Sequence, residues 1–195
     1  MPWPESIALQ FHLVDKATTD ESDYYGPFNS LLNYLFPVSE FYQVAPRFKS
    51  GGRGSIDFGV VFLVSRHRVP IFFVEPNTYV ASKKDSLRIQ ADNQMRERFI
   101  DFGFEDNPLP TLYGLSTFGT RFCVYEYDIA RDILTPEHIS RHRKLLTDAA
   151  PERWWDLDVL ELQGEDRLRE IIRQIKAMAA ELPSEFFACP LITRL

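Results

Sequence analysis

Two acidic residues lie beside apolar runs in the middle of the chain. Asp57 stands between Ile56 and Phe58, and Glu75 directly follows the run 71–74. An acidic side chain beside such a run needs a reason to be there. Two carboxylates at one end of a sheet are ligands that Mg²⁺, or Mn²⁺ as a substitute, accepts, and the bound ion would activate a water against a phosphodiester. The competing interpretation is that both acids cap strand ends and are solvated.

Whether the two carboxylates meet depends on the connection between them. The runs 55–64 and 69–75 are rich in Val, Ile and Phe and are typical of strands, with polar residues 65–68 as the joint. A symmetric four-residue joint leaves Asp57 and Glu75 one step out of register. They share a face only where the turn or a bulge shifts the pairing by one residue.

Hydrophobic spacing predicts the elements that position these residues. A short apolar stretch at 7–14 fits a strand or a helix. The predicted order is then α-β-β-β-α-β-β, followed by two C-terminal helices, over residues 26–36, 41–48, 55–64, 69–75, 84–102, 111–117, 120–128, 135–146 and 168–182. We expect one domain over 1–195, with a core at about 24–128 and the helices of 135–182 packed on it.

This order, with an Asp on the second strand and a Glu on the third, resembles the core of the PD-(D/E)XK nuclease-like superfamily. Longer phrases are similar to a group of uncharacterised fungal proteins with this fold; they lie at 24–36, 55–58, 70–75, 91–99, 112–121 and 148–154. The resemblance runs from Tyr24 to about Met178. It implies an α/β (α+β) fold with a restriction-endonuclease-like αβββαβ core, a mixed central sheet flanked by helices, and extra C-terminal helices.

The resemblance implies a metal site at Asp57 and Glu75, with a lysine two residues after the Glu to orient the attacking water or stabilise developing charge. Here that position is Asn77, which can form a hydrogen bond but brings no charge. Lys83 and Lys84, before the next helix, are candidates for a displaced lysine. Lys84 is the preferred candidate for the catalytic role. The simpler interpretation is that both lysines are solvated.

The helix predicted after the third strand carries further polar candidates. In the superfamily a polar residue of this helix often faces the site, and Gln94 is the best match. Arg98, one turn further along, is a second candidate, and with the basic segment it is also a candidate for weak nucleic-acid contact. Arg88, Asp92 and Arg96 are spaced by four residues, and the simplest interpretation is a surface ion-pair ladder of small energetic value.

The charge balance limits the partners. A net charge of −6 disfavours general nucleic-acid binding, which normally depends on a basic surface. A nucleic-acid site would therefore be a local basic patch, and the segment with Arg47, Lys49 and Arg53 is the most basic of the chain. A flexible β-turn is the alternative role for that segment.

Other residue types point to structure and location. His138 and His142 share a helical face but lack a third ligand, and Trp154 and Trp155 are expected to hold the C-terminal helices on the sheet. The two cysteines have no CxxC spacing and are interpreted as free thiols. The N-terminus lacks a signal-peptide pattern and no apolar run could cross a bilayer, so we expect an intracellular protein, cytoplasmic or nuclear, without a membrane partner.

Two functions from different classes follow. The first is a nuclease-fold protein with a degenerate site, serving as a binding or interaction domain with weak or no cleavage; Asn77, the lack of acids in 26–36 and the acidic charge favour it. The alternative is a Mg²⁺-dependent nuclease acting on DNA or RNA, with Lys84 or Asn77 assisting the water. Small-molecule chemistry in the same cleft is a third option, because fold does not dictate function.

Overall fold

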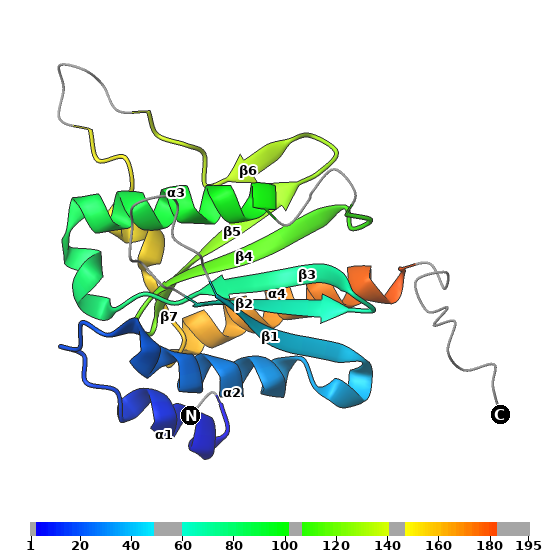
Figure 1. Ribbon diagram of the computed structural model, residues 1–195, viewed down its shortest axis with the longest axis horizontal. Helices are drawn as coiled ribbons and strands as arrows, with labels where there is room; N and C mark the ends of the chain where they lie inside the picture. Colours follow the sequence, from blue (N-terminus) through cyan, green and yellow to red (C-terminus); the bar gives the residue numbers. More distant parts are fainter. Residues whose placement is uncertain (1–2, 49–59, 102–106, 141–146, 183–195) are drawn as a thin grey trace.

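The computed structural model describes residues 3–48, 60–101, 107–140 and 147–182 (Figure 1). The helices and strands are α1 (Glu5–His12), α2 (Tyr25–Leu35), β1 (Tyr42–Phe48), β2 (Val60–Arg66), β3 (Val69–Glu75), α3 (Asp85–Asp101), β4 (Thr111–Phe118), β5 (Arg121–Asp128), β6 (Ile133–Thr135), β7 (Leu157–Asp158) and α4 (Leu162–Ala180). Short 3₁₀ turns cover Glu21–Tyr24, Val38–Glu40, Tyr79–Lys83 and Glu152–Trp155. In the described part of the chain, no helix combines the length and the apolar character that crossing a bilayer requires.

The strands form one mixed, seven-stranded sheet flanked by helices. Its order is β1-β2-β3-β4-β5-β6, with β7 also paired to β5. β3 and β4 run parallel, and the other pairs are antiparallel. A parallel pair needs a long crossover, which α3 supplies. The predicted order of elements from the first predicted helix through the fifth strand is confirmed, and α1 precedes it because the open stretch at 7–14 is helical.

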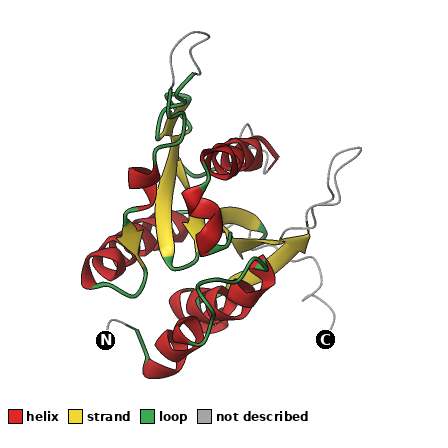
Figure 2. Cartoon of the chain, turned by 90° about the vertical axis from the view of Figure 1, so that its left-hand side faces the viewer, coloured by secondary structure: helices red, strands yellow, loops and turns green. Residues whose placement is uncertain are grey.

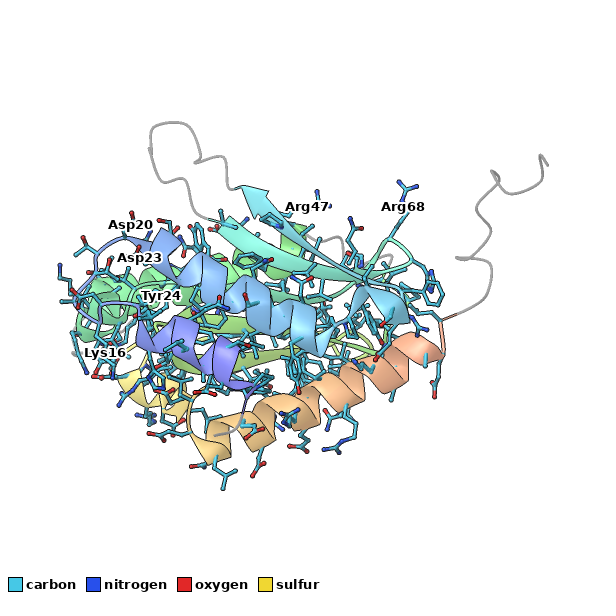
Figure 3. All side chains as sticks on the ribbon, turned by 90° about the horizontal axis from the view of Figure 1, so that it is seen from below. Lys16, Asp20, Asp23, Tyr24, Arg47 and Arg68 are labelled. Carbon is cyan, nitrogen blue, oxygen red and sulfur yellow. The ribbon has the colours of Figure 1, made fainter. Side chains whose placement is uncertain are left out.

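Helices cover both faces of this sheet (Figure 2). Successive side chains of a strand point to opposite faces, so Phe72 and Val74 pack in the core that α1, α2 and α4 share, while Phe73 packs with Ala91 and Met95 of α3. The helices α1, α2 and α4 lie together on the near side in Figure 3. Phe73 and, two residues further on, Glu75 therefore lie on the face of β3 that α3 covers, whereas Ile71, beside the irregularity in the pairing, packs in the other core.

The β2–β3 hairpin is tighter than the predicted four-residue joint. Ser65 and Arg66 belong to β2, and only His67 and Arg68 form the turn. Both turn residues have positive φ, 50° and 70°, as type I′ turns require. The pairing shifts by one residue between Val64 and Ser65. The predicted condition, a shift of the pairing by one residue, is therefore confirmed. Beyond the shift, Leu63 of β2 pairs with Phe73 of β3, so these two odd-numbered residues share a face.

The helix predicted to begin at Thr135 is wrong over the described residues. Ile133–Thr135 instead forms β6 against β5, and residues 136–140 have no regular structure. Asp132, with φ of 55°, turns the chain back so that Leu134 pairs with Tyr127. Strand pairing thus outcompetes the Thr-Pro-Glu helix-start signal, and Pro136 is the first residue beyond the ladder.

The last helix begins earlier than predicted, at Leu162, and its first turn lies against β7. A Cβ on Gly164 would collide with the main-chain carbonyl of Asp158. A carbonyl held in a strand cannot move aside as a side chain can. Gly164 is therefore the residue that permits this close helix–strand contact.

We predict that Gly164→Ala lowers the free energy of unfolding by about 3 kcal/mol, because the new methyl group overlaps main-chain atoms. Gly26→Ala is the matched control, since no described atom lies within 4 Å of the position that a Cβ would take there and Ala favours the α2 helix by about 0.5–1 kcal/mol. Urea denaturation of both variants measures the difference. Equal stabilities of the two variants would contradict the close contact.

Candidate functional site

Glu75 is the last residue of β3, where the predicted site lies, and it is almost completely buried. It neighbours Ser116 of β4 in the parallel register. The Ser116 hydroxyl accepts a hydrogen bond from the Trp155 indole at 3.2 Å, and the Trp155 ring packs 5.0 Å from that of Phe118. Trp155 thus holds the C-terminal segment on the sheet, as predicted.

Arg98 of α3 supplies the opposite charge. Its Nε lies 3.4 Å from Glu75 Oε2, and the two side chains are 16% and 2% exposed. Its Nη1 donates to Asp101 Oδ2 at 2.7 Å. A buried carboxylate is costly without a compensating charge, and Arg98 supplies one beside Glu75.

Gln94 lies one turn before Arg98 and is half-buried. Residues four apart lie on one face of a helix, so α3 turns Gln94 and Arg98 to the same side. Arg98 contacts Glu75 in the structure. The sequence had suggested only that a polar residue of this helix would face the site. The catalytic role given to Gln94 stays a prediction.

Asn77 fixes the backbone just after Glu75. Its N–H donates to the Thr117 carbonyl at 3.0 Å, and its carbonyl accepts from the Gly119 N–H at 2.8 Å. Gly119 has φ of 64°, which favours glycine. The Asn77 side-chain nitrogen is buried and finds no hydrogen-bond partner among the described residues. Asn77 therefore brings a donor, but no charge, to the position of the lysine.

The two candidate lysines lie further along. Lys83 donates to Glu152, which raises the pKa of Lys83, so its ammonium stays protonated at neutral pH. Its Nζ also lies 5.5 Å from the Tyr79 ring centroid. Lys84 is exposed and directly precedes α3. The structure thus engages Lys83 elsewhere and leaves Lys84 at the surface.

Several predicted residues lie outside the described part of the chain: Asp57, Lys49 and Arg53. Arg47 is exposed on β1, and Figure 3 shows it and Arg68 projecting on the same side. Arg98 was also a candidate for nucleic-acid contact. Its guanidinium is instead taken up by Glu75 and Asp101.

Glu75, as it stands, does not fit a site for a hydrated divalent cation. Mg²⁺ needs carboxylate oxygens that are open to the ion and its waters, whereas this carboxylate is buried against a guanidinium. Within the described ranges, no group of three or more His, Cys, Asp or Glu side chains could hold a metal. The magnesium site remains a prediction that depends on Asp57.

A buried polar network under α3 was missed from the sequence. Asp92 accepts hydrogen bonds from Tyr125 at 2.9 Å and from Arg96 Nε at 3.0 Å. Arg96 also donates to the Pro136 carbonyl, and His138 Nδ1 lies 3.8 Å from Asp92. The four-residue spacing between Asp92 and Arg96 revealed this pair in the sequence. The burial of Asp92 against Tyr125 of β5 is visible only in the structure.

The predicted surface ladder is therefore wrong for two of its three members. Arg88 and Asp92 are buried. Arg88 donates to the carbonyls of Ala150 and Ser82, both at 2.8 Å. The bond to Ala150 attaches the segment before Trp155 to α3, and the bond to Ser82 holds the 3₁₀ turn that precedes α3, so Arg88 is structural.

Comparison with protein-family models, with curated proteins and with solved structures found no match.

We predict that Glu75 and Arg98 are energetically coupled. Glu75→Gln or Arg98→Gln alone should cost about 2–4 kcal/mol, because each removes one partner of a charge–charge contact from a buried site. The double variant should recover about 1–3 kcal/mol of the summed losses. Urea denaturation of the full cycle measures this, with Asp101→Asn, on the exposed partner of Arg98, as a control that costs less than about 0.5 kcal/mol. Additive losses would show that the pair is incidental.

Cys123 should be unreactive in the folded protein. Burial, followed by the charges of Asp92 and Asp156, raises the pKa of its thiol far above neutrality, and the thiolate is the reactive form. In a Cys189→Ser variant, labelling by a disulfide reagent should be negligible in buffer and fast in denaturant. Rapid labelling in buffer would contradict the burial.

Proposed function

We propose that this protein is a PD-(D/E)XK-like domain with a degenerate site, which acts in binding or interaction and cleaves weakly or not at all. The observation that carries the proposal is the ion pair between Glu75 and Arg98. The resemblance implies that the equivalent Glu of superfamily members holds a metal ion. Here a guanidinium fixed on α3 balances that carboxylate.

Two further features support the proposal. The position of the superfamily's lysine carries Asn77, whose main chain is used to join β3 to the β4–β5 turn. The nearby Lys83 is held by Glu152. The order of α2, three antiparallel strands, α3 and a parallel β4 agrees with the core that the resemblance implies.

The partner class follows from the surface charge. The chain is acidic overall, so nucleic acid would bind at the local basic segment that contains the exposed Arg47, and a protein is the other partner class. Binding through this segment does not require the Glu75 carboxylate. It would weaken steeply with salt if phosphates are the contacts.

The second candidate is a Mg²⁺-dependent nuclease. One observation favours it: beyond the pairing shift between Val64 and Ser65, Leu63 of β2 pairs with Phe73, so Val61 and Leu63 lie on the face of the sheet that carries Phe73 and Glu75. This is the condition that the sequence sets for Asp57 and Glu75 to share a face. The two candidates make opposite predictions for metal binding.

We predict that Mg²⁺, Mn²⁺ and Ca²⁺ do not raise the melting temperature of the protein. A metal ion at a free concentration of about 100 times its Kd would stabilise the fold by about 2.7 kcal/mol. This would raise the melting temperature by roughly 5–10 °C. Thermal-shift titration of wild type, Asp57→Ala and Glu75→Ala measures this. Asp57→Ala and wild type should behave alike.

The opposite result would establish the second candidate. A metal-dependent rise that Asp57→Ala abolishes, together with divalent-dependent cleavage of DNA or RNA by the purified wild-type protein, would overturn the proposal.

A further inference from the structure

A separate pocket of about 400 Å³ opens beyond the carboxyl ends of the two parallel strands. Tyr79, which follows β3, and Thr120, which follows β4, line it together with Tyr24 and residues near α1 and β7. In sheets with parallel strands, ligands bind in the crevice outside these strand ends, and the volume is within the usual range for small-molecule sites. Figure 3 shows Lys16 and Tyr24 at this end of the molecule, opposite Arg68.

The lining carries opposite charges that do not neutralise one another. Lys16 and Arg121 are basic members, His12 is a further basic residue of the lining, and Asp158 and Glu161 are the acidic ones. Among the described residues, no ion pair within 4.0 Å joins a basic to an acidic member of this set. The formal charges balance, so the pocket is complementary to a ligand that carries one charge of each sign.

Arg121 is held in place while its hydrogen-bond donors remain available. Its guanidinium carbon lies 5.9 Å from the Tyr79 ring centroid, in the range of a cation–π contact. The nearest acid is Glu152, 3.9 Å away, and that carboxylate already accepts from Lys83. A guanidinium with a fixed plane is suited to bidentate binding of a carboxylate.

Asp158 is equally fixed on the acidic side. Its Oδ2 accepts from the Thr120 hydroxyl at 2.7 Å, and its Oδ1 accepts from the Leu160 N–H at 2.9 Å. Each carboxylate oxygen has two lone-pair sites, so both can accept another donor. Glu161 is exposed at the rim. These carboxylates suit an ammonium group.

Apart from His12, the rest of the lining is apolar, aromatic or hydroxyl-bearing. Phe11 and Tyr24 are buried, and Val14 and Leu160 complete the apolar lining. Burial, followed by the charges of Asp23 and Asp15, raises the pKa of Tyr24, so its phenol stays neutral. The pocket therefore offers an apolar surface beside its charged groups, of which Arg121 and Asp158 are cross-strand neighbours.

We propose that this pocket binds a small zwitterion, an α-amino acid with an apolar side chain. Its carboxylate pairs with Arg121 and Lys16, its ammonium group with Asp158 and Glu161, and its side chain packs on Phe11 and Leu160. Neither Glu75 nor Arg98 lines the pocket. The assignment is thus independent of the function proposed for the β3 site.

Three probes with one carbon skeleton test the assignment. L-leucine carries both charges, 4-methylpentanoate lacks the ammonium group, and 3-methylbutylamine lacks the carboxylate. Calorimetric titration of the full-length protein should show leucine binding at least about tenfold more tightly than either single-charge probe, since each charge-assisted contact adds to affinity.

Variants assign the two ends of the ligand. Arg121→Gln should weaken leucine binding about tenfold and leave 3-methylbutylamine unaffected, and Glu161→Gln should weaken leucine but not 4-methylpentanoate. Arg131→Gln, at a side chain that is 76% exposed and lies outside the pocket lining, is the control and should bind leucine as wild type does. Thermal melting of each variant verifies that it folds.

Three results would overturn the proposal. Binding of a single-charge probe as tightly as leucine would make the pocket a simple anion or cation site. Absence of leucine binding at millimolar concentrations would remove the assignment altogether. Equal weakening by Arg121→Gln and Arg131→Gln would place the binding elsewhere.

Discussion

The two main-chain hydrogen bonds of Asn77 to the β4–β5 turn fix the carboxyl ends of the only parallel pair in the described sheet. Strand β3 ends at Glu75, and the next residue is a proline, which cannot continue a ladder with its own N–H. Asn77 restores the connection one residue later, donating to Thr117 and accepting from Gly119. These bonds fix the positions of Glu75, which precedes the junction, and of Tyr79 and Thr120, which follow the two strands.

The junction separates two environments. On one face of the sheet, the buried carboxylate of Glu75 lies against Arg98 of α3. Beyond the strand ends, Tyr79 and Thr120 line the zwitterion pocket. The two regions share a backbone but no lining side chain. A change in one can therefore leave the other's charges untouched.

Helix α3 covers its face of the sheet with few apolar residues. Ala91, Met95 and Phe99 make its buried stripe, and charged side chains complete the contact. Arg88 satisfies loop carbonyls, Asp92 joins Tyr125 to Arg96, and Arg98 balances Glu75. Buried charges require specific partners, whereas apolar side chains accept many arrangements. The contact between α3 and the sheet therefore depends on specific charged partners and on the positions of those partners.

The sequence predicted the parts of the fold that depend on local pattern. The Val, Ile and Phe runs located β3 residue for residue, and the spacing of Phe28, Leu31 and Leu32 located α2. It failed at Thr135, where a helix-start motif lost to pairing with β5, a partner that no local window contains. For the site, the sequence selected Glu75, Gln94 and Arg98, yet the burial of the Glu75–Arg98 pair depends on how α3 lies on the sheet.

The His67–Arg68 turn has a consequence for how the chain reaches this structure. Positive φ at two residues with side chains costs roughly 1–2 kcal/mol each relative to glycine, so this turn does not favour its own formation. The β2–β3 hairpin is therefore unlike hairpins that zip up from an Asn-Gly turn. Its strands must first be held together by Leu63 and Phe73, which pair across the ladder. Hydrophobic contact away from the loop, rather than the loop itself, then supplies the favourable free energy that closes this hairpin.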